Sequence, residues 1–130
     1  MVDFHNKFKP IRKFFQRRLY YKYHCDISHT ATIHPSVTFP HPIAIVIGSQ
    51  ATIHKNCSIY QNVTIGSNFD SDNSMPTIEA NTLIGTGAKL IGNITVGKNC
   101  IIGANAVVTK SVPNNSIVTG VNNIRKRDNI

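Results

Sequence analysis

The chain has 130 residues, of which 41% are hydrophobic, and its formal net charge at pH 7 is +8. This length fits one domain, and the composition is that of a globular protein rather than a disordered one. No apolar run approaches the roughly 20 residues that a transmembrane helix needs, and the first residues lack the uncharged apolar core of a signal peptide. We therefore expect a cytoplasmic protein.

The positive charge is concentrated at the two ends of the chain. Seven of the fourteen basic residues lie within the first 22 positions, and three more form a cluster at 125–127. Because the middle is nearly neutral, the pattern does not indicate a nucleic-acid-binding domain, and we expect no nucleic-acid partner. Cys25, Cys57 and Cys100 are an odd number of cysteines without metal-site spacing, which argues against a disulfide framework or a zinc knuckle.

The first predicted element is a helix over residues 9–23, KPIRKFFQRRLYYKY. Pro10 is acceptable in a first turn, Ile11, Phe15 and Leu19 recur at helical spacing, and much of the remaining surface is basic. We predict that residues 1–24 form a basic helical cap over the open end of the domain that follows. The alternative is that this segment contacts an anionic membrane surface.

From residue 27 onward a large apolar residue returns every six positions, with a two-residue slip before Ile47 and a longer break before Ile78. This series comprises Ile27, Ile33, Phe39, Ile47, Ile53, Ile59, Ile65, Ile78, Ile84, Leu90, Val96, Ile102 and Val108. Small or β-branched residues, Ile43, Cys57 and Cys100 among them, form a second series four positions after the first. A strict period of six indicates strand–turn units that point one large and one small residue inward and stack into a parallel β-solenoid. Cys57 and Cys100 are then core thiols rather than nucleophiles.

Two stretches carry a resemblance to a known family. DISHTATIHPSVTFPHPIAIVIG (26–48) and IGTGAKLIGNITVGKNCIIGANAVVTKSVP (84–113) resemble the hexapeptide-repeat acyltransferases, in the branch of the serine acetyltransferases. Relatives in that branch include O-acetyltransferases for capsular and exopolysaccharide sugars. The resemblance implies an all-β fold, a left-handed parallel β-helix over residues 25–121 with three hexapeptides per turn, followed by a basic tail at 122–130. It also implies a homotrimer that uses acetyl-CoA as co-substrate and needs no metal.

The resemblance places the general base at His41, in front of the aliphatic run IAIVIG, and an orienting carboxylate at Asp26. A neutral imidazole with a pKa near ~6.5 can remove the proton of an attacking hydroxyl, and a carboxylate fixes its tautomer. A backbone N–H near Gly66 and Ser67 is expected to stabilise the oxyanion, with Met75 beside the acceptor. The alternative for His41 is a corner residue that only packs.

The acetyl-CoA site implied by the resemblance is a groove between neighbouring β-helices. Its matching positions are Gly85, Thr86 and Ala104, with Lys110 and Arg125 toward the CoA phosphates. The alternative for each cation is a solvated surface charge.

The acceptor is the least determined feature. Serine acetyltransferases carry an acidic residue before the histidine and an Arg-His pair before a later proline, whereas this chain has Pro40 and the pair Ser74-Met75. The segment 67–76, which interrupts the repeat, contains two aspartates and no cation, and we expect it to be a loop that sets acceptor specificity; the alternative is a tolerated surface insertion. We therefore expect the acceptor to be a sugar hydroxyl in polysaccharide biosynthesis. We expect the enzyme to work in the cytoplasm or at the inner face of the membrane. The alternatives are a serine O-acetyltransferase and a catalytically silent β-helix that serves assembly or sugar binding.

Overall fold

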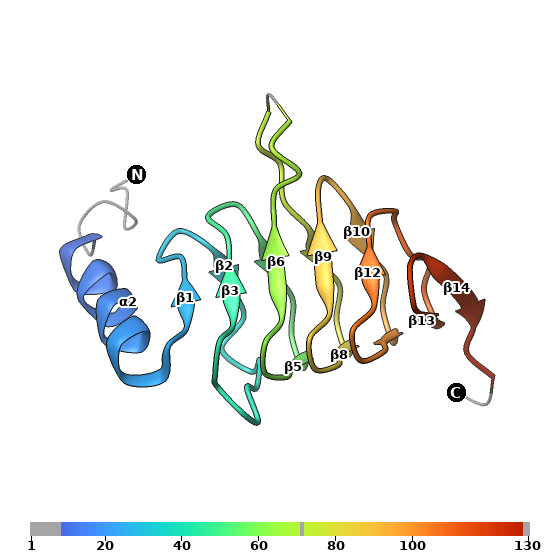
Figure 1. The fold of residues 1–130 in the computed structure, drawn as a ribbon, viewed down its shortest axis with the longest axis horizontal. Coiled ribbons are helices and arrows are strands. Elements are labelled where there is room, and N and C mark those ends of the chain that lie inside the picture. Colours follow the sequence, from blue (N-terminus) through green and yellow to red (C-terminus); the bar gives the residue numbers. More distant parts are fainter. Residues whose placement is uncertain (1–8, 71, 129–130) are drawn as a thin grey trace.

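The computed structural model describes residues 9–70 and 72–128, which form one helix followed by a stack of short strands (Figure 1). The helix α2 (Lys9–Tyr23) stands at the N-terminal end, and the strands wind away from it toward the C-terminus. The strands form three sheets whose neighbouring strands pair in parallel, apart from β13 and β14. This confirms the predicted parallel β-solenoid.

The three sheets are named here A, B and C in the order in which the chain visits them. Sheet A contains β1 (Asp26–Ile27), β3 (Val46–Ile47), β6 (Thr64–Gly66), β9 (Lys89–Ile91) and β12 (Val107–Val108). Sheet B contains β2 (Thr32–Ile33), β4 (Thr52–Ile53), β7 (Thr77–Ile78) and β10 (Thr95–Val96). Sheet C contains β5 (Ser58–Ile59), β8 (Leu83–Ile84), β11 (Ile101–Ile102), β13 (Ser116–Thr119) and β14 (Asn123–Lys126). Each coil therefore has three corners, which we call the A–B, B–C and C–A corners.

The core is built from the two predicted series. Every large residue of the repeat from Ile47 to Val108 is at most 1% exposed, and the earlier members Ile27, Ile33 and Phe39 pack against this core while half-buried. Burying one such aliphatic side chain contributes about 1.5–3 kcal/mol, so the series of large residues dominates the packing energy.

The cysteines of the repeat are part of this core. Cys57 and Cys100 are at most 1% exposed, and burial raises the pKa of both thiols. Since the thiolate is the nucleophilic form, the raised pKa fits the packing role predicted for both residues.

The two-residue slip is absorbed in the C–A corner before β3, and there one prediction is wrong. Ile45 takes the inward position and is 0% exposed, whereas Ile43, expected in the inward series, is 58% exposed. The chain turns sharply here, because the Ile43 N–H donates to the carbonyl of His41 at 2.8 Å and Ala44 has a φ of 53°. As a result this corner extends further than its neighbours (Figure 1).

Asparagine explains many of the tight corners. Asn56, Asn62, Asn81, Asn99 and Asn105 all lie in the left-handed region, with φ between 55° and 62°. Asparagine reaches this region at lower cost than other residues that carry a Cβ, so it serves where the repeat pattern called for a glycine or polar corner.

Both ends of the chain differ in part from expectation. The helix has its predicted bounds, but none of its residues is buried, and Ile11 and Phe15 are 52% and 57% exposed. Residues 123–126, predicted to belong to a basic tail, instead form β14, which pairs antiparallel with β13 and extends sheet C. No helix in the described ranges is long and apolar enough to cross a membrane.

Candidate functional site

The C–A corner brings predicted site residues from several coils into one column. Thr38 bridges to Ser58, β5 pairs with β8, and β8 pairs with β11, which fixes the register of the corner that follows each strand. Two residues beyond the last large inward residue of each coil, the column consists of His41, Gln61, Thr86 and Ala104. The predicted base and two of the predicted CoA positions thus lie along the same edge of one chain.

His41 is exposed in the extended corner. Its ring lies 6.1 Å, centroid to centroid, from that of Tyr60, with a tilt of 57° between the planes. Among the described residues no side-chain hydrogen bond engages the imidazole. Both ring nitrogens are therefore open to a substrate hydroxyl or an orienting group.

Asp26 opens β1, and its strand pairs with β3, which follows the corner of His41. Its carboxylate Oδ1 accepts a hydrogen bond from Gln16 Nε2 at 3.3 Å, and no hydrogen bond joins Asp26 to His41 in the described part of the chain. Asp26 begins the first coil, and His41 follows the last strand position of that coil. The orienting role of Asp26 stays a prediction.

The part of the C–A column that contains the predicted CoA-binding positions is tightly packed. The Gly85 N–H donates to the Ile102 carbonyl at 2.8 Å, and a Cβ on Gly85 would lie 2.8 Å from that oxygen and 2.9 Å from the Ala104 nitrogen. Only glycine fits there without moving the backbone. Thr86 Oγ1 donates to the Gln61 carbonyl at 3.3 Å, which links the neighbouring coil into the same wall.

The two predicted phosphate-binding cations lie elsewhere. Lys110 follows β12 at the A–B corner, and Arg125 lies on β14 in sheet C, where it pairs with Ile117. Both are exposed. The structure does not gather them with Gly85, Thr86 and Ala104 in one chain.

The predicted acceptor segment rises from the A–B corner, on the edge opposite the C–A column (Figure 1). Gly66 ends β6 and its carbonyl accepts from the Gly92 N–H at 2.9 Å, while Ser67 Oγ accepts from the Phe69 N–H at 2.8 Å. Met75 is half-buried, with its sulfur over Gly48 in the space that a Cβ there would need. The segment thus returns across the A–B corner of the preceding coil.

Local hydrogen bonds occupy both acids of this segment. Asp70 accepts from Asn68 Nδ2 at 2.6 Å, and Asp72 accepts from the N–H of Ser74 at 3.2 Å and from its hydroxyl at 2.9 Å. These bonds, the one from the Ser74 N–H foremost, lower the pKa of Asp72. The contacts within the segment thus favour the ionised form of Asp72.

The predicted base and the predicted acceptor residues are separated by the width of sheet A. The strand β6 alone has three residues, which corresponds to about 10 Å at about 3.3 Å per residue. One chain therefore does not bring His41 together with Gly66, Ser67 and Met75.

Two further residues at the C–A corner were not predicted from the sequence. Tyr60 faces His41, and the side-chain oxygen of Gln61 is buried without a hydrogen-bond partner in the described structure. Both occupy the repeat positions of Gly85 and Thr86 one coil earlier, so aligning the repeats position by position is the signal that finds them.

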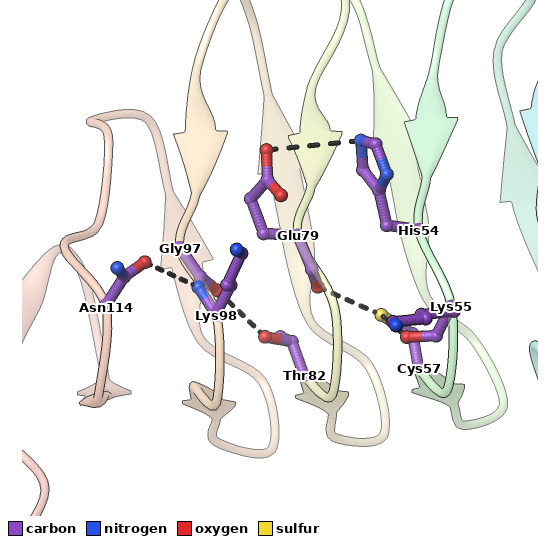
Figure 2. Close-up of polar contacts among 8 residues, drawn as sticks. All are labelled: His54, Lys55, Cys57, Glu79, Thr82, Gly97, Lys98 and Asn114. Atoms are coloured by element: carbon purple, nitrogen blue, oxygen red, sulfur yellow. Dashed lines mark hydrogen bonds and ion pairs between the residues drawn. The ribbon is translucent and has the colours of Figure 1, made fainter.

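A further hollow lies on a different corner. It has a volume of about 790 Å³ beside the B–C corner and is lined in part by Glu79, Lys98 and Asn114. Figure 2 shows polar contacts at and beside this corner: His54 Nε2 lies 4.0 Å from Glu79 Oε1, the Lys98 N–H donates to Asn114 Oδ1 at 2.7 Å, and the Cys57 thiol donates to the Glu79 carbonyl at 3.1 Å. None of the predicted site residues lines this hollow, and nowhere in residues 9–70 and 72–128 do three His, Cys, Asp or Glu side chains gather to hold a metal ion.

Comparison with known proteins agrees with this architecture. Residues 75–110 match the family model described as bacterial transferase hexapeptide (six repeats). The chain is 40% identical over 116 residues to a serine acetyltransferase of Buchnera aphidicola, covering 87% of this chain and 42% of the relative. It is 38% identical over 120 residues to a serine acetyltransferase of Bacillus pumilus, covering 83% of this chain and 55% of the relative.

Solved structures give the same result. The crystal structure of serine acetyltransferase from Brucella abortus in complex with coenzyme A matches with a TM-score of 0.82 and 37% identity, over 93% of this chain and 50% of that one. The chain thus spans about half the length of the relatives that it matches.

Proposed function

We propose that this chain, a member of the hexapeptide-repeat transferase family in its serine acetyltransferase branch, transfers an acetyl group from acetyl-CoA to a hydroxyl. The observation that carries the proposal is the C–A column, in which the predicted base His41 shares an edge with Thr86 and Ala104. A Brucella abortus relative with the same fold was solved with coenzyme A, which supports the choice of donor. The same relatives support a left-handed winding of the solenoid.

The proposed chemistry is direct acyl transfer. His41 accepts the proton of the acceptor hydroxyl while that oxygen attacks the thioester carbonyl, and backbone N–H groups near Gly66 and Ser67 stabilise the oxyanion. When the intermediate collapses, the carbon–sulfur bond breaks and the imidazolium returns its proton to the CoA thiolate. Asp26, at the start of the same coil, would hold the imidazole tautomer and stabilise the imidazolium once its carboxylate turns from Gln16.

We further propose that the active site forms between subunits of a homotrimer. Because His41 and the segment 67–76 lie on opposite edges of sheet A, a neighbouring solenoid has to supply one of the two. Such an arrangement also offers a place for Lys110, which lies on the edge away from Gly85 and Thr86. Light scattering at micromolar concentration should give three times the mass of the chain, and a monomer that is fully active would contradict the shared site.

Serine is the first acceptor that we propose. The relatives are serine acetyltransferases, and none of the comparisons supports the expected role in polysaccharide biosynthesis. A sugar hydroxyl is the second candidate, favoured by one observation. The segment 67–76 has Asp70 and Asp72 as its charges and no cation that would pair with the carboxylate of an amino acid.

The test is acetyl-CoA thiol release with serine and with a panel of sugars and nucleotide sugars, with mass spectrometry of the product. Saturation by serine in the sub-millimolar range, as is usual for dedicated enzymes, supports the first acceptor, and saturation by a sugar alone supports the second. Absence of acceptor-dependent thiol release from the trimer would overturn the enzymatic proposal in favour of a silent β-helix.

A further inference from the structure

Helix α2 contacts the solenoid through a narrow face. Arg12, Gln16 and Leu19 are its half-buried residues, and they share one side of the helix because they are four and three positions apart. Gln16 makes the specific contacts, since its Oε1 accepts from His29 Nδ1 at 2.7 Å and from the His29 N–H at 3.2 Å, and its Nε2 donates to Asp26 at 3.3 Å. The helix is thus held in a defined orientation without burying any of its residues.

The opposite side of the helix presents aromatic rings between arginines. Phe14 and Tyr21 are 60% and 71% exposed, and seven positions apart they lie on the same face. Together with Arg17 and Arg18 they line a shallow hollow of about 370 Å³. We call these four residues the outer face of α2.

The charge of the helix is unopposed. Residues 9–23 contain six Lys or Arg and no Asp or Glu. In the described structure the one ion pair joins His54 and Glu79, so no carboxylate lies within 4.0 Å of these cations. The helix therefore carries a strong positive potential on a surface that also exposes large aromatic side chains.

We propose that the outer face of α2 docks on an anionic lipid surface. Arginine and lysine attract anionic headgroups, and aromatic side chains partition to the boundary between headgroups and acyl chains, so the two residue types favour the same partner. A second copy of the helix is disfavoured because six cations would face six cations. A helix docked by this face lies parallel to the membrane. The C–A column remains open, because α2 stands at the N-terminal end of the solenoid (Figure 1).

Vesicle binding tests this directly and independently of acetyl transfer. We expect the full chain to co-sediment with vesicles of phosphatidylglycerol and phosphatidylcholine in low salt, to bind phosphatidylcholine vesicles much more weakly, and to be released by salt. The double variant Arg17→Gln/Arg18→Gln should weaken binding about 25-fold, from about 5-fold for each charge. The double variant Phe14→Ser/Tyr21→Ser should weaken it as well, because the aromatic rings no longer insert.

Matched variants distinguish the contribution of the helix to vesicle binding from those of net charge and of an exposed aromatic ring elsewhere. Lys55→Gln/Lys98→Gln removes the same two charges from the B–C corner, and Phe69→Ser removes a ring that is 94% exposed in the segment 67–76. Both should bind vesicles like the wild type. Equal loss in the Lys55/Lys98 variant would overturn the proposal, because net charge would then suffice.

Two other outcomes would name a different occupant and also overturn the proposal. The first is an oligomer larger than the trimer that the Phe14/Tyr21 variant abolishes, without vesicle binding by the wild type. The second is binding to duplex DNA that exceeds vesicle binding and survives loss of both aromatic rings. Circular dichroism of each variant confirms that the helix is retained, which the exposure of the substituted residues leads us to expect.

Discussion

His41→Ala tests catalysis separately from folding. The side chain is exposed and stands outside both inward series, and its one aromatic neighbour in the described structure is Tyr60 at 6.1 Å. Its removal deletes no core contact. We therefore expect the free energy of unfolding to change by no more than about 0.5 kcal/mol.

The expected loss of activity is much larger. A positioned general base contributes about 10²–10⁴-fold in rate, which corresponds to about 2.7–5.5 kcal/mol of activation free energy. Asp26→Asn should cost less, because the imidazole remains available and is merely less well oriented. The asparagine keeps an oxygen that accepts from Gln16, so the contact between α2 and β1 is preserved.

The assay is the initial rate of thiol release from acetyl-CoA at saturating acceptor, combined with thermal unfolding of each variant. His54→Ala is the matched control, since this exposed histidine lies at the B–C corner and its imidazole lies 4.0 Å from the carboxylate of Glu79. It should leave turnover unchanged. If His41→Ala turns over within about threefold of the wild type, the assignment of the general base is wrong; if it unfolds more easily by more than about 1 kcal/mol, the reading of the corner as free of packing is wrong.

Three further outcomes follow from local geometry. Gly85→Ala should lower the free energy of unfolding by about 1–3 kcal/mol, measured by urea denaturation, because the new Cβ meets the Ile102 carbonyl at 2.8 Å; an unchanged midpoint would contradict that contact. Cys57 and Cys100 should resist alkylation at pH 8 in the native protein and react after denaturation, since burial raises the pKa of both thiols; equal rates in the two states would rule out their core placement. The pKa of His29 is lowered from 6.5 by desolvation and by nearby cations of α2, so the unfolded state binds more protons and the anchoring of α2 should weaken as the pH falls below 6.5. Hydrogen exchange of the helix amides at pH 7.5 and 5.5 measures this effect, and a difference that persists unchanged in His29→Gln would point to another group.

Much of the candidate site could be predicted from the repeat. Thr86 and Ala104 follow Ile84 and Ile102 at the same distance, so the period alone stacks them. Gln61 could have been predicted in the same way, because it follows Ile59 at the same distance. His41 follows Phe39 at the same distance; what the period did not predict is the corner after His41, where Ile45 rather than Ile43 points inward.

The sequence by itself determined the solenoid, since a period of six fixes locally which side chain of each strand points inward, and burial of the large series from Ile47 to Val108 follows. Tertiary structure decided what depends on contacts between distant segments. Helix α2 is held by Gln16 rather than by the apolar residues Ile11 and Phe15. The reason is that the first coil presents Asp26 and His29 as hydrogen-bond partners for Gln16. Tertiary structure also set the predicted base and the segment 67–76 on opposite edges of sheet A, because the winding of the coils, and not the period, decides which corner each residue occupies.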